Sequence, residues 1–185
     1  MQSEIRSVME DPPPEFPPME RPPGDVAIAE LFKAHRLGLV RFAFLLVGDQ
    51  ETAEDIVQDA FAAVHHRWSR LADHDQLLPY LRTVVLNGCR AVHRRRVIAR
   101  RWFGVEREVP FWSAEVQALL GETQREVFAA VRDLSRRQRE AVVLRYYLDL
   151  SEADTAAVMG ISRGTVKSTV SRALRKLAEK LEENR

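Results

Sequence analysis

Residues 151–177 read SEADTAAVMGISRGTVKSTVSRALRKL, and this stretch decides how the C-terminal part of the chain folds. Ser151 followed by Asp154 is a capping signature that predicts a short helix, and Gly160 is placed to end it. Ser162 is the expected N-cap of a longer second helix with apolar residues at helical spacing. These residues are Val166, Val170, Ala173, Leu174, Leu177 and Leu181.

The two helices and the turn between them have the proportions of a helix-turn-helix, which places its second helix in the major groove of DNA. Residues 161–177 contain five Lys and Arg residues and no acid. Arg and Lys bind guanine edges or phosphates, and Ser and Thr bind phosphate oxygens. The polar side chains outside the apolar stripe are therefore predicted to bind DNA: Arg163, Thr165, Lys167, Ser168, Ser171, Arg172 and Arg175. The alternative is a helical hairpin with a solvated basic face.

Charge is segregated along the whole chain. The 185 residues are 45% hydrophobic and 30% charged, which suffices for one or two small domains, and the net charge is only +1. Residues 49–59 nevertheless hold five acids and no base, whereas residues 90–101 hold six arginines and no acid. Together with the basic stretch after Ile161, this pattern predicts two separate contacts with a polyanion.

Helical periodicity also organises the first half of the chain. Apolar spacing predicts a long helix from Asp25 to Gly48, and a third helix begins near Leu77. The helix between them has an acidic face opposite an apolar stripe of Ala53, Ile56, Val57, Ala60, Phe61 and Val64. No segment has a strand pattern, so we expect an all-α protein with two small helical domains. The expected divisions are a disordered proline-rich tail (1–24), a first domain (25–96), a linker (97–121) and a second domain (122–185).

Several kinds of site are disfavoured by composition. Cys89 is the single cysteine, so no disulfide and no multi-cysteine zinc site is expected, and its apolar neighbours suggest a packing role. The five histidines form no i, i+4 pair on one helix face, so we expect neither a metal nor a cofactor. No apolar run reaches the roughly 18 to 20 residues of a membrane span, and no secretory signal is visible. We expect a cytoplasmic protein without membrane insertion.

Three stretches carry a resemblance to a known family. LSRRQREAVVLRYYL (134–148), followed by GISRGTVKSTVSRAL (160–174), resembles region 4 of bacterial RNA polymerase sigma factors. AEDIVQDAF (53–61) resembles the clamp-binding segment of their region 2. In this order, and over residues 25–182, the chain resembles the extracytoplasmic-function class of small two-domain sigma factors. VVLNGCR (84–90) resembles an actinobacterial branch of that class.

The resemblance implies a protein without an active site that binds core RNA polymerase, directs it to specific promoters and helps to open the minus-10 element. Asp55, Gln58 and Asp59 would contact the clamp of the largest subunit, and region 4 would contact the flap of the second-largest subunit and the minus-35 element. The loop 69–76 and Asn87 would capture a flipped base. Arg90, Arg94, Arg95 and Arg96 would hold phosphates of the minus-10 element.

The resemblance also implies that the linker threads into the polymerase, and that an anti-sigma factor is a possible partner, as it is for many relatives. One departure is Ala91, where family members often have an acidic residue, and it bears on the detailed minus-10 contacts.

Two other functions compete with this interpretation. A stand-alone helix-turn-helix regulator accounts for residues 135–181 but leaves the acidic second helix and the arginine-rich third helix unexplained. A nuclease or recombinase would hold Mg²⁺ on the acidic residues of the second helix. Those residues are Glu51, Glu54, Asp55 and Asp59, and no nucleophile stands beside them. We therefore expect no catalytic residues.

Overall fold

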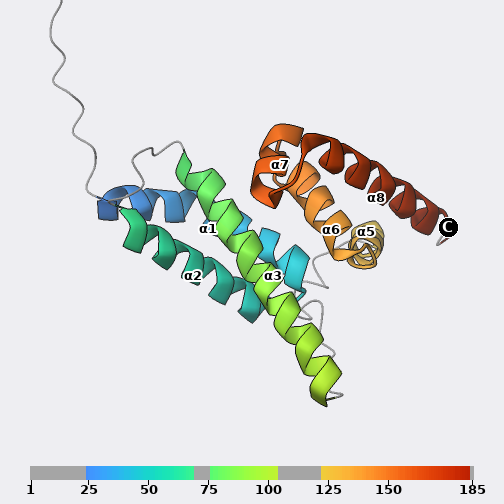
Figure 1. Ribbon diagram of the computed structural model, residues 1–185, viewed down its shortest axis with the longest axis horizontal. Coiled ribbons are helices and arrows are strands. Elements are labelled where there is room, and N and C mark those ends of the chain that lie inside the picture. The colour runs from blue at the N-terminus through green and yellow to red at the C-terminus, as the bar shows by residue number, and fades with distance from the viewer. Residues whose placement is uncertain (1–23, 69–75, 104–121, 184–185) are drawn as a thin grey trace, which may run out of the picture.

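The computed structural model describes residues 24–68, 76–103 and 122–183, and these ranges are built from helices (Figure 1). The first half contains α1 (Gly24–Val47), α2 (Gln50–Arg67) and α3 (Leu77–Phe103). The second half contains α5 (Glu122–Arg132), α6 (Arg136–Val142), the π-helical turn η3 (Val143–Tyr147), α7 (Glu152–Met159) and α8 (Arg163–Glu183). The all-α prediction is confirmed, and no strand occurs in the described ranges. Residues 1–23 of the expected tail, residues 69–75 of the expected loop and residues 104–121 of the expected linker lie outside them.

The turn between α1 and α2 depends on two neighbouring residues. Gly48 has φ of 76°, a left-handed conformation that glycine adopts without the steric cost of a Cβ. Asp49 caps α2, because its carboxylate accepts a hydrogen bond of 3.2 Å from the backbone N–H of Thr52. The turn folds α2 back along α1, where Phe32 and Phe61 meet edge to face with ring centroids 5.0 Å apart.

Helix α2 buries the predicted face. Its buried residues are Ala53, Ile56, Val57, Ala60, Phe61 and Val64, and these are the six apolar residues of the predicted stripe. They pack against α1 and α3. The acidic side of the helix remains in solvent.

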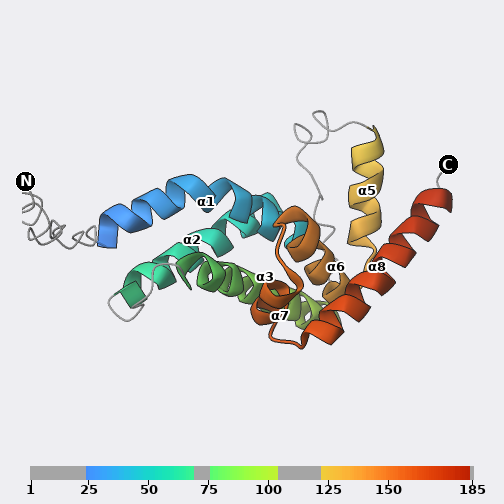
Figure 2. The same cartoon turned by 90° about the horizontal axis from the view of Figure 1, so that it is seen from above.

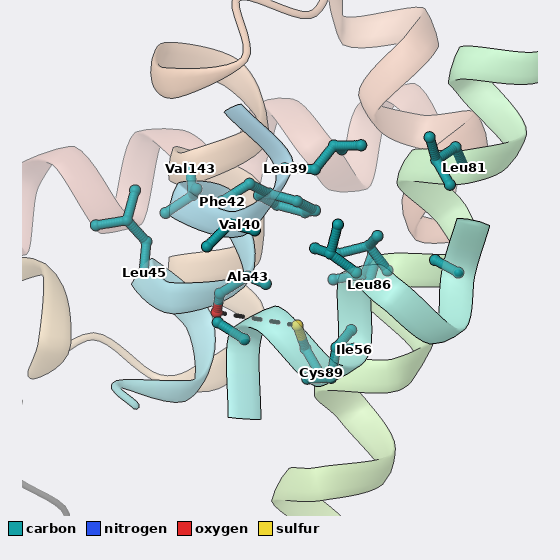
Figure 3. Close-up of a cluster of buried hydrophobic side chains, with 14 of the residues drawn as sticks. Leu39, Val40, Phe42, Ala43, Leu45, Ile56, Leu81, Leu86, Cys89 and Val143 are labelled. Atoms are coloured by element: carbon teal, nitrogen blue, oxygen red, sulfur yellow. Dashed lines mark hydrogen bonds between the residues drawn. The ribbon is translucent and has the colours of Figure 1, made fainter. Parts of the chain in front are cut away.

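Helix α3 packs against α1 and α2, and the three helices form the first unit. Helix α3 approaches α2 closely. A Cβ added at Gly88 would lie 2.8 Å from Cγ2 of Ile56, so glycine permits this separation of the two helices. Next to it, Cys89 is buried with its Sγ 4.0 Å from the carbonyl oxygen of Ala43 (Figure 3). The helix continues to Phe103, beyond residue 97, where we expected the linker to begin.

In the second unit, which comprises α5–α8, helix α6 begins with a capping box. The backbone N–H of Ser135 donates to Oε1 of Gln138 at 3.1 Å, as the sequence signature predicts. In the sequence, Ser135 with Gln138 is a capping-box signature that predicts a helix from there through Tyr147. Instead, the last five residues, Val143–Tyr147, form a π-helical turn that leads into α7.

The predicted helix-turn-helix is present in α7 and α8. The Ser151 hydroxyl accepts a hydrogen bond of 3.0 Å from the backbone N–H of Asp154 and so caps α7. Gly160 ends α7 in the left-handed conformation, with φ of 68°. Ser162 then caps α8 by accepting from the N–H of Thr165 at 3.2 Å. The three caps fix both the length of α7 and the start of α8.

The two units pack directly on each other. Figure 2 shows the first unit and the second unit side by side, with α7 beside α3, while α8 runs away from α1–α3. A single cluster of buried residues joins the units, and Val143 of η3 lies close to Phe42 of α1 in it (Figure 3). None of the described helices combines the length and the apolar character that crossing a membrane requires.

Candidate nucleic-acid interface

The first candidate surface is the solvent side of α8. Most of the predicted DNA-binding residues of this helix are exposed: Arg163, Lys167, Ser168, Ser171, Arg172 and Arg175. Thr165 differs, because it is half-buried and its Oγ1 lies 2.8 Å from the Ser162 hydroxyl within the helix cap. The opposite side packs through Val166 and Ala173, which are fully buried. Helix α8 therefore has a basic polar face in solvent and an apolar face packed against the rest of the second unit.

Two lysines near the C-terminal end of α8 fix its direction. Lys176 donates a hydrogen bond of 2.9 Å to the carbonyl oxygen of Asp133, and Lys180 forms an ion pair with the carboxylate of the same residue. This contact with Lys180 lowers the pKa of Asp133. Because Asp133 lies at the turn between α5 and α6, these contacts tie the exposed helix to the rest of the second unit.

The second candidate surface lies along α3. Asn87, Arg94 and Arg95 are exposed. Arg94 follows Asn87 by two helical turns, which puts the two side chains on one face about 10 Å apart. An amide and two guanidinium groups in this arrangement provide a hydrogen-bonding side chain for a base and cations for phosphates.

Arg90, on the same helix, is already engaged within the chain. Its Nη2 lies 2.7 Å from Oε2 of Glu140 on α6, and its Nε lies 3.2 Å from both carboxylate oxygens. Nη2 also donates to the carbonyl oxygen of Met159, the last residue of α7, at 3.3 Å. In this conformation Arg90 joins the two units through the Nε–Nη2 side of its guanidinium, and its predicted phosphate contact stays a prediction.

Arg96 has a different internal role. Its Nη1 donates a hydrogen bond of 2.5 Å to the carbonyl oxygen of Val47 at the end of α1, and its Nη2 lies 3.7 Å from the carboxylate of Asp49. The cation therefore stabilises the negative end of the α1 dipole. Both partners belong to the first unit, so this contact does not depend on how the two units are placed. The phosphate contact predicted for Arg96 stays a prediction.

Arg139 is a residue of this region that sequence analysis missed. Its Nη1 donates to the carbonyl oxygen of Leu46 at 3.3 Å, so the second unit also contacts the end of α1. Its Nη2 donates to the carbonyl oxygen of Leu134 at 3.3 Å and to that of Arg132. Burial lowers the pKa of this guanidinium. In the sequence, Arg139 stands between the polar residues Gln138 and Glu140, so nothing distinguishes a buried contact of its side chain from an exposed position.

The third candidate surface is the acidic side of α2. Asp55, Gln58 and Asp59 are exposed together, on the face opposite the buried stripe. Glu54, on the same side, accepts a hydrogen bond of 2.6 Å from Gln50. The acidic face and the basic face of α3 belong to one three-helix unit, and each is open to a separate partner.

Cys89 and the described histidines are the remaining titratable candidates from the sequence. Burial raises the pKa of the Cys89 thiol to about 12, which suits the packing role expected from the sequence. In the part of the chain that the structure describes, no group of three or more His, Cys, Asp or Glu side chains could hold a metal ion.

Family models match both units. The model of sigma-70 region 2 matches residues 31–97, and the model of sigma-70 region 4 matches residues 124–177. The chain belongs to the sigma-70 family of RNA polymerase sigma factors. Region 2 thus comprises most of α1–α3, and region 4 comprises most of α5–α8. The match to region 2 accounts for the half of the chain that a stand-alone regulator leaves unexplained.

Individual relatives place this sigma factor in the extracytoplasmic-function group. It is 34% identical over 158 residues to the RNA polymerase sigma-E factor of Streptomyces antibioticus, covering 83% of each chain. It is 33% identical over 155 residues to the ECF RNA polymerase sigma factor SigM of Mycobacterium tuberculosis, covering 84% of this chain and 77% of SigM. Both relatives are actinobacterial, as the VVLNGCR stretch predicted.

Solved structures of relatives share the fold. The sigma factor RpoE of Bartonella quintana, in complex with the anti-sigma factor NepR, aligns with a TM-score of 0.69 and 28% identity. That alignment covers 85% of this chain and 98% of RpoE. CnrH, in complex with the cytosolic domain of CnrY, aligns with a TM-score of 0.67 and 25% identity, covering 87% of this chain and 91% of CnrH.

Proposed function

We propose that three separate surfaces of this sigma factor carry promoter-specific initiation. The acidic face of α2 binds the clamp of the largest polymerase subunit through Asp55, Gln58 and Asp59. The basic face of α3 binds the opened minus-10 element, and α8 reads the minus-35 element. The observation that carries this proposal is the segregation of charge, because an acidic docking face and two basic faces stand exposed on different helices.

On the minus-10 surface, the proposed contacts divide into two kinds. Asn87 offers an amide to a base that has left the helical stack, and the exposed Arg94 and Arg95 hold phosphates of the same strand. Opening costs a few kcal/mol for each unstacked base, and captured bases with phosphate contacts offset this cost. Arg90 joins this set when region 4 moves away from region 2.

On the minus-35 surface, the residues outside the apolar stripe of α8 enter the major groove. The N-terminal half of the helix provides Arg163, Lys167 and Ser168, and the following turns provide Ser171, Arg172 and Arg175. Thr165 contributes as part of the cap. Region 4 also contacts the flap of the second-largest subunit.

In vitro transcription tests the proposal directly. Purified protein is added to core RNA polymerase from a related bacterium and a pool of genomic promoter fragments. We expect sequence-specific transcripts that depend on the added protein. An absence of transcripts, together with a footprint produced by the protein alone, would instead identify a stand-alone helix-turn-helix regulator.

A charge reversal tests the docking face. Asp55→Lys combined with Asp59→Lys should abolish binding to core polymerase, because it reverses both carboxylates at the proposed contact without touching the buried stripe. The matched control is Glu182→Lys with Glu183→Lys, which makes the same change of charge at the exposed end of α8. Unchanged polymerase affinity in the α2 variant would refute the docking assignment.

An anti-sigma factor is a further proposed partner. The two solved relatives are complexes with anti-sigma factors or with the cytosolic domain of CnrY. An anti-sigma factor for this chain would suppress the promoter-specific transcripts when added to the transcription reaction in equimolar amounts. A candidate that binds the chain and leaves transcription unchanged would not be one.

A further inference from the structure

The contact between the two regions is centred on one buried carboxylate. Glu140 lies on α6 and is only 2% exposed. Its two oxygens accept hydrogen bonds from Nε and Nη2 of Arg90 on α3, at 2.7 to 3.2 Å. Within region 4, Nε of Arg136 lies at the longer distance of 3.7 Å, and Arg139 interacts with Glu140 electrostatically. The hydrogen bonds described for this buried anion therefore come from region 2.

The geometry of this pair imitates a phosphate contact. A carboxylate presents two oxygens side by side, and arginine binds them in the same forked manner in which it binds two phosphate oxygens. While Arg90 holds Glu140, the Nε–Nη2 side of its guanidinium is used and cannot be offered as a fork to a phosphate. The carbonyl oxygen of Met159, at the negative end of α7, adds a further acceptor for the same guanidinium.

From these contacts we propose that Glu140 is an internal phosphate mimic, which closes region 4 onto region 2 and competes with promoter DNA for Arg90. This inference rests on the proposed role of Arg90 at the minus-10 element. Closure withholds the forked Nε–Nη2 contact from DNA, so the closed chain binds the minus-10 strand less tightly than the open chain.

The closed form leaves the other surfaces available. Asp55 and Asp59 on α2 are exposed, as are Arg163 and Arg172 on α8. Polymerase can therefore dock on the closed chain, and engagement of region 4 elsewhere on the polymerase or on DNA pulls Glu140 away from Arg90. This Arg90–Glu140 lock thus favours minus-10 binding by the chain that is already bound to polymerase.

Other contacts across the interface also hold region 4 on region 2. Arg139, next to Glu140, holds the carbonyl oxygen of Leu46, and Val143 packs in the cluster with Phe42. Asp154 on α7 exerts an electrostatic attraction on the half-buried Arg82 of α3. Loss of Glu140 weakens the closed form, and the remaining contacts determine how far it opens.

Two single variants on opposite sides of the pair give the decisive experiment. Both Glu140→Ala and Arg90→Ala remove the ion pair, so both should expand the full-length chain in small-angle X-ray scattering. Binding is then measured without polymerase, by fluorescence anisotropy of a labelled single-stranded oligo(dT). This probe suffices because phosphate contacts do not depend on sequence. Glu140→Ala should bind about tenfold more tightly, as expected when a charged hydrogen bond is released.

Arg90→Ala should open the chain without this gain, because the liberated phosphate-binding group is missing. The matched control for charge is Glu182→Ala, which removes one exposed carboxylate from α8 and should change affinity little. A Glu140→Ala chain that stays compact, or that expands without binding oligo(dT) more tightly than the Glu182→Ala control, would overturn the lock.

A failure of the proposed function gives a different pattern. If wild-type and Arg94→Ala/Arg95→Ala chains bind the oligonucleotide equally, α3 is not the nucleic-acid surface. The scattering result for Glu140→Ala then still reports whether the ion pair closes the chain.

Discussion

Nη1 of Arg96 lies 2.5 Å from the backbone carbonyl oxygen of Val47, the last residue of α1. The preceding residue, Arg95, points to solvent from the same helix. Adjacent arginines in the run RRR at 94–96 therefore act on different parts of the molecule. One stabilises the end of a helix inside region 2, and the other is available to nucleic acid.

This difference separates the expected effects of two substitutions. Arg96→Ala should lower the free energy of unfolding by about 1 kcal/mol, because a charged hydrogen bond to the end of α1 is lost at a partly exposed site. Arg95→Ala should leave unfolding unchanged and weaken binding to DNA. Chemical denaturation of both variants measures the first effect. Equal stability of the two variants would contradict the structural role of Arg96.

Sequence readout and phosphate contact should also be separable. Arg172→Ala on α8 should reduce transcription from promoters with one minus-35 sequence more than from others, by about 1–3 kcal/mol in discrimination. Arg95→Ala should reduce transcription from all promoters by a similar factor, since a phosphate contact carries no sequence information. Transcription from a panel of minus-35 variants measures both. Uniform losses for both substitutions would refute the division.

The features that sequence analysis predicted correctly are local ones. The buried stripe of α2 follows from helical periodicity, and the caps at Ser135 and Ser151 follow from residue pairs three positions apart. The cap at Ser162 follows from the place of this serine between the turn and the apolar stripe of α8. Gly160 predicts the end of α7 because glycine adopts the left-handed conformation without the steric cost of a Cβ. Each signal lies within one helical turn and needs no knowledge of the tertiary fold.

The contacts that sequence analysis missed join distant parts of the chain. Arg90 and Glu140 are 50 residues apart, and Arg139 and Leu46 are 93 residues apart. A charged side chain at a polar helix position predicts solvent exposure, so nothing in the pattern indicated that Glu140 is buried. The π-helical turn at Val143–Tyr147 was also missed, since its apolar spacing is that of an ordinary helix over so short a length.

Cys89 should be chemically inert in the folded protein. Its thiol is 4% exposed, and burial raises its pKa to about 12, so the reactive thiolate is almost absent at neutral pH. We expect alkylation by iodoacetamide near pH 7.5 to be slower than that of the same thiol in denaturant by about a hundredfold or more. Mass spectrometry of quenched samples follows the reaction. Rapid labelling of the native chain would favour a redox-sensing role instead.

Acid should loosen the contact between the two regions through His93. His93 is exposed, and the partial desolvation of its imidazole is the first cause that lowers its pKa from the ordinary value. The positive charges of Arg136, Arg139 and Arg100 lower it further, while Glu140 raises it. Arg136, Arg139 and Glu140 all belong to region 4, and each of the two arginines affects His93 more than Glu140 does. Separation of the regions therefore removes a net repulsion and lets the pKa of His93 rise toward its ordinary value. The closed form therefore favours the neutral imidazole, and protonation favours the open form.

The contribution of His93 to closure is thus fully present above about pH 6.5 and is lost as the pH falls through its lower value in the closed form. Small-angle scattering between about pH 7.5 and about pH 5.5 should show the wild-type chain expanding at the acid end. His93→Asn, which does not titrate in this range, should expand less over the same interval. If the two proteins expanded equally, protonation of another group would be responsible, and His93 would have no part in opening the chain.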